Sequence, residues 1–320
     1  MRAFVTGSTG FLGQALVREL LARGWDVSAL VRTFERARQL PAGVRAVPGD
    51  VTKPESLRPG LRQADAVFHL AALTTLGLSP RDQARMQRIN VGGARHVLTL
   101  AAEAGVQRII HVSDVAVYGD TRGERPAEGC GPGTVFESAY QQTRAAAHFE
   151  VAGALQHQGA PVIIAAPGAL YGPGGTAGLG RLLRWQLRRR LLVMLGPDNA
   201  RCWTYVDDAA LGLALAAERG QPGETYHLAG PAHTLREALA VAARLSRAPA
   251  PLIWLPSALA RSLARLARRP LPALAERLRA LGGAAYLADS AKAERALGWS
   301  ARPLAAGLPP TLAWLQERWT

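Results

Sequence analysis

Lysine is nearly missing from this chain, and cysteine is scarce. The 320 residues contain only Lys53 and Lys292 as lysines and only Cys130 and Cys202 as cysteines. Two cysteines provide neither a disulfide framework nor the ligand spacing of a metal centre, so we expect no metal site and a reducing, cytoplasmic setting. No apolar run approaches the roughly 18 residues of a membrane span. The first residues also lack the charged, apolar and small-residue blocks of a signal peptide.

Arginine dominates the charge of the chain. Of the 38 basic residues 36 are Arg, against 24 acidic residues, and the formal net charge is +14. Arginines are dispersed, with denser runs at 181–190 and 260–270, whereas nucleic-acid binders usually concentrate charge in one stripe with interleaved aromatic side chains. We therefore expect no nucleic-acid partner. Solvated helix faces explain the arginines best, with an anionic ligand or a membrane surface as the less favoured alternative.

Short apolar runs alternate with helical patterns through the first half of the chain. Strands that are apolar on both faces and separated by helices are typical of a parallel sheet covered on both sides. The sequence therefore predicts an α/β fold with a doubly wound parallel sheet. Its strands are expected at 2–7, 26–32, 46–51, 64–72, 108–113, 161–168 and 225–230.

Glycines follow the first predicted strand at once and open the first predicted helix. Gly7, Gly10 and Gly13 permit a tight turn, a close approach of a pyrophosphate to the backbone, and packing of helix on sheet. The N-terminus of the helix adds positive potential. Because the spacing occurs between a strand and a helix, it predicts a dinucleotide-binding site.

The second predicted strand indicates which dinucleotide is bound. An NAD site places a carboxylate at the C-terminal end of this strand, against the 2′-hydroxyl of the adenosine ribose. This strand ends at Arg32 with no acid, and Asp26 begins the strand, at the opposite edge of the sheet. Arg32, helped by Arg36, suits a 2′-phosphate, while a solvated arginine is the alternative. NADP is the expected cofactor, and NAD the second choice.

The pattern of the chain changes after Pro167, where loops rich in Gly and Pro join helices rich in Arg and Leu. We expect an NAD(P)-binding domain over 1–165, rejoined by about 198–230. A smaller C-terminal lobe, expected to bind substrate, comprises 166–197 and 231–320.

Ordered segments along the whole chain resemble those of the extended short-chain dehydrogenase/reductases, also called the NAD-dependent epimerase/dehydratase family. They are VTGSTGFLG (5–13), GDVT (49–52), FHLAA (68–72), NVGG (90–93), HVSDVAVYG (111–119), APGALYGPGG (166–175), YVDDAA (205–210) and AERALGW (293–299). Residues 254–269 and 307–319 are most similar to the branch of 3β-hydroxysteroid and dihydroflavonol reductases. The resemblance implies a Rossmann fold and cofactor contacts from Gly7, Thr9, Gly10, Phe11, Leu12, Gly13, Arg32, Asp50, Val51, Leu70, Ala71, Ala72, Asn90, Tyr140, Arg144 and Pro167.

Two of the three catalytic positions differ from the family pattern of a Ser or Thr hydroxyl, a Tyr and a Lys. Tyr140 matches the tyrosine. Arg144 stands at the lysine position, one helical turn away on the same face. Asp114, four residues before Tyr118, stands at the hydroxyl position, and Ser113 is expected to point to the opposite face of its strand.

These changes leave three arrangements open. Arg144 keeps the charge that lowers the pKa of a nearby phenol, but it cannot lose a proton and is a poor proton relay. An ionised Asp114 would raise the pKa of Tyr140 and repel an oxyanion. An Asp114 paired with Arg144 would leave Tyr140 isolated. An Asp114 kept neutral by burial would donate a hydrogen bond to a carbonyl.

Thr74, Tyr171 and Arg201 are the candidate substrate contacts. Tyr171 matches the family loop that meets the nicotinamide, with packing of that loop as the alternative. Arg201, seven residues before Asp208, resembles an arginine that nucleotide-sugar members use on a diphosphate. His69 is expected to be a satisfied buried histidine.

Leucines and arginines alternate with helical period over 259–268. This pattern predicts an amphipathic basic helix. We expect its leucines to pack against the protein, and contact with a greasy substrate or a membrane surface is the alternative.

Together these patterns predict an oxidoreductase that transfers hydride between NADP(H) and a carbonyl or alcohol of a small, hydrophobic substrate, with Tyr140 as the proton donor. A cofactor-binding sensor or assembly protein without turnover is one alternative. A nucleotide-sugar epimerase or dehydratase is another, although the acid pair of the dehydratases is absent because Val115 follows Asp114. The sequence leaves a monomer and a homodimer open.

Overall fold

The computed structural model describes residues 1–282 and 284–319. The strands are β1 (Arg2–Thr6), β2 (Asp26–Val31), β3 (Arg45–Pro48), β4 (Ala66–His69), β5 (Arg108–Val112), β6 (Val162–Pro167), β7 (Ala169–Tyr171), β8 (Val193–Leu195), β9 (Ala200–Tyr205), β10 (Thr225–Leu228), β11 (Ala232–Thr234) and β12 (Ile253–Leu255).

The helices and helical turns are α1 (Phe11–Ala22), α2 (Phe34–Ala37), η1 (Pro54–Ser56), α3 (Arg58–Leu61), α4 (Pro80–Gln87), η2 (Arg88–Gly92), α5 (Gly93–Glu103), η3 (Val115–Tyr118), α6 (Ala139–Ala145), η4 (Ala146–Gly153), α7 (Ala154–His157), α8 (Gly178–Leu187), α9 (Val206–Arg219), α10 (Leu235–Ser246), α11 (Ser257–Ala267), α12 (Pro272–Gly282), α13 (Ala291–Leu297) and α14 (Leu304–Trp319).

A parallel sheet forms the centre of the fold. Within the described residues it has seven strands in the order β10-β6-β5-β4-β1-β2-β3, and all neighbouring strands run parallel. Successive strands are added toward one edge of the sheet from β1 to β3, and toward the other edge from β4 to β6. The switch point between β1 and β4 is where such sheets bind ligands, beyond the carboxyl ends of the strands. The predicted doubly wound α/β fold is confirmed.

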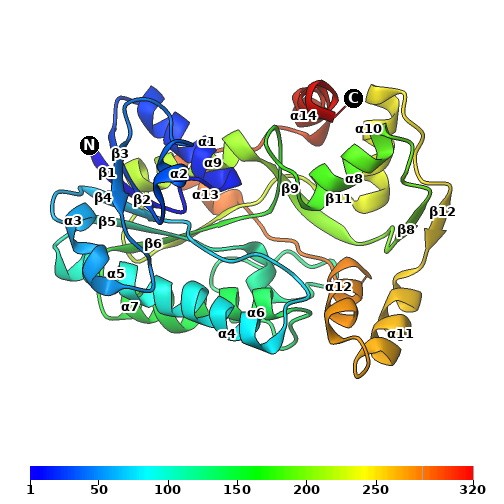
Figure 1. Cartoon of the computed structure of the whole chain (residues 1–320), viewed down its shortest axis with the longest axis horizontal. Coiled ribbons are helices and arrows are strands. Elements are labelled where there is room, and N and C mark those ends of the chain that lie inside the picture. Colours follow the sequence, from blue (N-terminus) through cyan, green and yellow to red (C-terminus); the bar gives the residue numbers. More distant parts are fainter. Residues whose placement is uncertain (283, 320) are drawn as a thin grey trace.

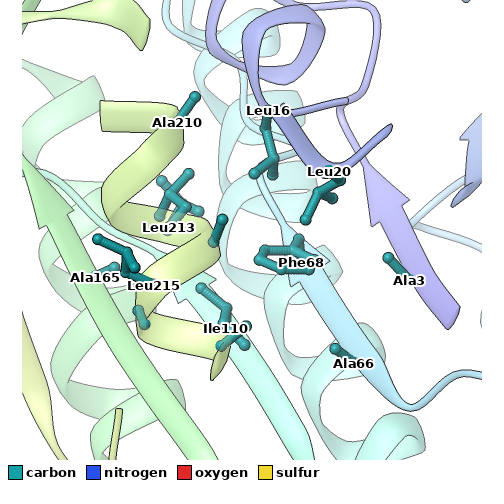
Figure 2. Close-up of a cluster of buried hydrophobic side chains, with 14 of the residues drawn as sticks. Ala3, Leu16, Leu20, Ala66, Phe68, Ile110, Ala165, Ala210, Leu213 and Leu215 are labelled. Carbon is teal, nitrogen blue, oxygen red and sulfur yellow. The ribbon is translucent and has the colours of Figure 1, made fainter. Parts of the chain in front are cut away.

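Helices cover both faces of this sheet, with α1, α9 and α13 on one side and α5, α6 and α7 on the other (Figure 1). Successive strand residues point to opposite faces. Val5 therefore packs in the core under α1 and α9, and Phe4 packs in the core under α5. In Figure 2, Leu16 of α1 and Leu213 of α9 close over Phe68 of β4. Each of these fully buried side chains contributes about 1.5–3 kcal/mol of hydrophobic stabilisation.

The remaining strands build the C-terminal part of the protein. β10 pairs in parallel with β6, so the stretch predicted at 225–230 does return to the main sheet. β9 lies instead in a separate sheet, β11-β9-β7, and β12 pairs with β8. The helices α8, α10 and α14 pack together around a third core, and α11 and α12 form a hairpin at one end of the molecule (Figure 1). The residue bounds assigned to the two lobes stay a prediction.

The helix that carries Tyr140 and Arg144 is the start of a longer helical run. Ser138 caps α6 by accepting a hydrogen bond at its Oγ from the amide of Gln141, at 3.3 Å. The run continues without a break through η4, which is π-helical, into α7. Such π-helical turns occur often at functional sites. Among the described residues, no helix is long and apolar enough to cross a membrane.

Candidate active site

A cavity of about 310 Å³ lies beyond the carboxyl ends of β1, β2 and β4. Phe11, Leu12 and Gly13 begin α1 beside it. Most of the residues predicted to contact a cofactor line this cavity, namely Gly7, Thr9, Gly10, Arg32, Asp50, Val51, Leu70, Ala71 and Ala72.

The glycines of this cavity are required by its shape. Gly7 has a φ of +74°, and a Cβ there would lie 2.7 Å from the amide nitrogen of Ala71. A Cβ at Gly13 would overlap the carbonyl oxygen of Gly7. α1 begins at Gly10 without a side-chain cap, and the first amides of a helix have no intrahelical partner. The loop therefore offers unpaired N–H groups and the positive end of a helix to a pyrophosphate, so a dinucleotide fits.

The outer end of this cavity carries positive charge. Arg32 and Arg36 both line it. Arg32 is exposed and forms no hydrogen bond or ion pair within 1–282 and 284–319, whereas Arg36 donates a hydrogen bond to Gln39 at 3.3 Å. Asp26 lies at the start of β2, at the opposite edge of the sheet. Asp50 is oriented by Thr52, whose amide and hydroxyl both donate to its Oδ1 at 2.9 Å.

A second cavity, of about 280 Å³, adjoins the first, because Leu73 lines one and Thr74 lines the other. Its wall is largely apolar, and its polar residues include Asp114, Tyr140 and Arg201. The apolar side chains are Leu76, Val115, Ala116, Ala169, Leu170, Leu179, Leu182, Met194, Trp203, Leu235 and Ala280. The second cavity thus suits a hydrophobic compound whose polar end reaches Tyr140.

Tyr140 and Asp114 are directly bonded in this second cavity. The Tyr140 hydroxyl donates to Oδ2 of Asp114 at 2.8 Å, and the amide of Ala116 donates to Oδ1 at 2.8 Å. Burial raises the pKa of Asp114. Burial, together with the charge of Asp114, also raises the pKa of Tyr140, and the charge of Arg144 only partly opposes this. Both groups therefore hold their protons more tightly than they would in water.

Arg144 is 5% exposed and donates from its guanidinium to the carbonyl of Val112, at the end of β5. It forms no ion pair with Asp114 among the described residues, so the arrangement that would leave Tyr140 isolated is wrong. Ser113 points the other way, as expected, and its hydroxyl meets Nδ1 of His148 at 2.7 Å. Arg144 thus contributes its charge to the pocket from a fixed, buried position.

Two histidines lie on the strands next to Arg144. His69 of β4 stacks on His111 of β5 with ring centroids 5.7 Å apart, and its Nδ1 meets the hydroxyl of Thr6 at 2.8 Å. Burial and the charge of Arg144 lower the pKa of His69 to about 3, and the same causes lower the pKa of His111. Both rings are therefore neutral near pH 7. His69 is only half satisfied, because its Nε2 has no partner among the described residues.

Three predicted contact residues have structural surroundings instead. The side chain of Asn90 is held between Leu73, whose amide donates to it at 2.7 Å, and Thr143, to which it donates at 2.9 Å. Pro167 is buried at the end of β6. Tyr171 is 1% exposed and packs in the core of the C-terminal lobe, 5.5 Å from the ring of Tyr205. The structure therefore does not bring Tyr171 to the second cavity, and its alternative role, packing of the loop, is the one observed.

Glu276 and Tyr286 are site residues that the sequence analysis missed. Glu276 of α12 is 5% exposed, and its Oε1 accepts from the amide of Ala139, at the start of α6, at 2.9 Å. It thereby ties the helix that carries Tyr140 to the C-terminal lobe. The sequence does contain a signal for Glu276, because Glu276 is the only acidic residue in 238–288. The ring of Tyr286 lies 5.3 Å from the guanidinium of Arg201 and holds it at the second cavity.

Comparisons with known proteins identify the family. The sequence model of the NAD dependent epimerase/dehydratase family matches residues 3–229. The chain belongs to this family. It is 33% identical to a 4-hydroxy-2-methyl-3-oxo-4-farnesyl-3,4-dihydroquinoline-1-oxide ketoreductase of Stigmatella aurantiaca, over 94% of this chain and 92% of the relative.

Two further comparisons match nearly the whole chain. The chain is 31% identical to a putative dihydroflavonol 4-reductase of Synechocystis, over 98% of this chain and 94% of the relative. The crystal structure of gox2253 superposes with a TM-score of 0.85 at 28% identity, covering 98% of each chain. The predicted likeness to the dihydroflavonol reductase branch is confirmed. The altered residues Asp114 and Arg144 thus lie within the frame of an NAD(P)-dependent family.

Proposed function

We propose that this protein reduces the carbonyl of a lipophilic ketone with NADPH. The observation that carries the proposal is the hydrogen bond between Tyr140 and Asp114. It joins two groups whose pKa values are raised by burial, in an apolar cavity beside a dinucleotide cavity. Reduction of a ketone needs a hydride on carbon and a proton on oxygen. The pair is suited to supplying the proton.

The choice of NADPH rests on Arg32. Its guanidinium is exposed at the outer end of the dinucleotide cavity with Arg36 nearby, and no carboxylate ends β2. An arginine in that place favours a 2′-phosphate over a ribose hydroxyl. Bound NADPH supplies the hydride for the carbonyl carbon.

Tyr140 and Asp114 supply the proton in two transfers. The Tyr140 hydroxyl gives its proton to the carbonyl oxygen as the hydride arrives, and the resulting phenolate takes the proton of Asp114 across 2.8 Å. The products are the alcohol, the oxidised cofactor and an ionised Asp114, which regains a proton from solvent. Arg144 stabilises the transient phenolate through its charge.

The raised pKa values favour reduction over oxidation. An alcohol dehydrogenase needs a base to accept a proton, and a phenol whose pKa lies above its ordinary value is rarely ionised near neutrality. Burial also favours the protonated form of Asp114, which is an acid and not a base. The site therefore works best in the direction that consumes a proton.

The apolar lining of the second cavity supports a lipophilic substrate. The relative from Stigmatella aurantiaca has the name of a ketoreductase of a farnesylated 3-oxo compound, and the leucines of this cavity would suit a compound of that class. Arg201 would meet a polar or anionic group at the far side of such a molecule. A nucleotide-sugar epimerase would use the same arginine on a diphosphate, but it also needs a base, which the raised pKa values disfavour.

The test is to incubate the purified protein with NADPH and a panel of lipophilic ketones, with nucleotide sugars as a second panel. We expect NADPH oxidation with one equivalent of alcohol formed from at least one ketone. Tight NADPH binding with no turnover would favour the sensor or assembly alternative. Interconversion of nucleotide sugars without net oxidation of cofactor would favour the epimerase.

A further inference from the structure

Most of the excess positive charge of this chain belongs to two stretches of the C-terminal lobe. Residues 178–197 and 238–275 contain eleven arginines and no Asp, Glu or Lys, so they carry +11 of the net charge of +14. The arginines are dispersed along the chain, as the sequence analysis found, but the acids that would balance them are missing here. These stretches form α8, β8, α11 and most of α10, together with β12.

The leucines of α11 face solvent. The residues that α11 buries are Ala260 and Ala264, at 0% and 1% exposure, against α12. Leu259 and Leu263 are 39% and 41% exposed, and Leu266 is 77% exposed. The expectation that these leucines pack against the protein is therefore wrong, because the small alanines form the contact between α11 and α12.

The exposed apolar surface continues beyond α11. Leu271, just before α12, and Leu274, on α12, are 55% and 45% exposed. On the paired strands β8 and β12, which lie at the same end of the molecule (Figure 1), Val193 and Ile253 are register partners and both are exposed. Leu192 and Leu252 adjoin them, since the amide of Leu252 donates to the carbonyl of Leu192 at 3.0 Å.

We call these two parts, the α11–α12 hairpin and the β8–β12 edge, the basic apolar face. We propose that the basic apolar face docks on an anionic lipid bilayer. Its leucines are bordered by exposed arginines, with Arg189 and Arg190 before β8 and Arg265, Arg268 and Arg269 at the end of α11. The acid that these elements contain, Glu276 of α12, is buried. An exposed surface of leucine and arginine matches the interface of a membrane that carries anionic lipid.

Other occupants fit this face less well. A second copy would bring the exposed arginines of one basic apolar face against those of another, which like-charge repulsion opposes. Single-stranded nucleic acid is held by aromatic side chains that stack on its bases, and the exposed apolar residues here are aliphatic. Lipid satisfies the leucines and the arginines together, because aliphatic side chains enter the acyl region while arginines remain with the headgroups.

The basic apolar face shares its elements with the second cavity. Met194 of β8 and Ala280 of α12 line the cavity, while Val193 and Leu274 of the same two elements are exposed on the face. If the substrate is a lipophilic ketone, as the proposed function has it, docking brings the cavity wall to the phase in which that ketone dissolves. The docking itself does not depend on the reaction.

The experiment is flotation of the full-length protein with two kinds of vesicle, phosphatidylcholine alone and phosphatidylcholine mixed with phosphatidylglycerol. We expect binding to the anionic vesicles, weakened by added salt, and little binding to the neutral ones. Arg265→Gln with Arg268→Gln should lower the affinity about 25-fold, at about fivefold for each arginine. Leu263→Gln with Leu266→Gln should lower it at least about tenfold.

Matched controls separate this face from the general charge and apolarity of the chain. Arg62→Gln with Arg295→Gln removes two exposed arginines from other surfaces, and Val135→Gln removes an exposed aliphatic side chain from the N-terminal half; none should change vesicle binding by more than the loss of general charge predicts. Circular dichroism and NADPH titration verify that each variant folds.

Three results would overturn the proposal. The first is a wild-type protein that does not float with anionic vesicles at low salt. The second is equal binding by the face variants and the controls. The third is a dimer in solution that Leu263→Gln with Leu266→Gln converts to a monomer without vesicles, since a second copy would then occupy the face.

Discussion

The two adjoining cavities of this protein are built in different ways. The dinucleotide cavity is shaped by backbone, through glycines that lie within seven residues of one another, and its outer end carries the exposed Arg32. The second cavity is shaped by side chains from distant segments, with Asp114 after β5, Tyr140 on α6 and Arg201 on β9. The first kind of site tolerates almost no change, whereas the second can exchange its catalytic groups and keep its fold.

This difference explains how the altered residues are accommodated. Asp114 keeps a hydrogen bond to Tyr140 at 2.8 Å, so the carboxyl occupies the place of a hydroxyl without displacing the tyrosine. Arg144 reaches past the pair to the carbonyl of Val112. The chemistry of the second cavity has changed, while the cradle for the dinucleotide has not.

The largest effect is expected from breaking the second cavity alone. Tyr140→Phe removes the proton donor, and kcat/KM for ketone reduction should fall by about 10²–10⁴, while NADPH affinity stays unchanged. Tyr286→Phe is the matched control, because it removes a phenol hydroxyl from the same cavity and keeps the ring that contacts Arg201. Steady-state kinetics measure both variants. An equal loss of kcat/KM in both variants would contradict the assignment of Tyr140 as the proton donor.

The second largest effect on activity is expected from a substitution that distorts the dinucleotide cavity. A Cβ in Gly13→Ala overlaps the carbonyl oxygen of Gly7 and shifts the loop, and a displacement of about 1 Å in a site costs about 100-fold in kcat/KM. Gly92→Ala is the control, since within the described residues no heavy atom lies within 4 Å of its added Cβ. Fluorescence titration with NADPH should show a large loss of affinity for the first variant only.

A smaller effect, on cofactor affinity, is expected at the outer end of the dinucleotide cavity. Arg32→Gln should weaken NADPH binding about tenfold, because a charge-assisted hydrogen bond to the 2′-phosphate is lost, and should leave NADH binding unchanged. Arg38→Gln is the control, since Arg38 is exposed nearby, stacks on Phe34 and does not line the cavity. Tighter binding of NADH than of NADPH by the wild type would reject this role of Arg32.

The smallest effect concerns stability. Burial raises the pKa of Asp114 above its usual 3.8, so its ionisation costs more in the folded state than in the unfolded state. Stability is therefore lost as pH rises from 3.8 through the raised pKa. Asp114→Asn should raise the free energy of unfolding at neutral pH by up to about 1 kcal/mol, measured as a higher melting temperature, and the gain should vanish in acid. A destabilised Asp114→Asn at neutral pH would contradict the direction of the shift.

The sequence predicted the fold and the dinucleotide cavity better than it predicted the second cavity, for physical reasons. The glycine spacing and the alternation of strands and helices act over short separations, so a single sequence reveals them. The contact between Tyr140 and Asp114 depends on how β5 and α6 are placed, which left three arrangements open. Glu276 caps α6 from 137 residues away, and no local pattern announces such a bond.

The C-terminal lobe provided the clearest errors. Tyr171 matches a family loop, yet it packs in the core because β7 turns it toward Tyr205. The leucines of α11 have the period of a packed helix, yet the alanines make the contact. A helical period shows which residues share a face of the helix. It does not show whether that face packs against the protein or lies at its surface.

The most direct test of the account is the pH dependence of a single turnover. NADPH-loaded wild-type protein is mixed with a reducible lipophilic ketone, and NADPH absorbance is followed across pH, beside Asp114→Asn. We expect a wild-type rate that falls as pH rises through the raised pKa of Asp114, and a variant that is slower and independent of pH. A wild-type rate that is flat or increases with pH, or the same profile in both proteins, would contradict it.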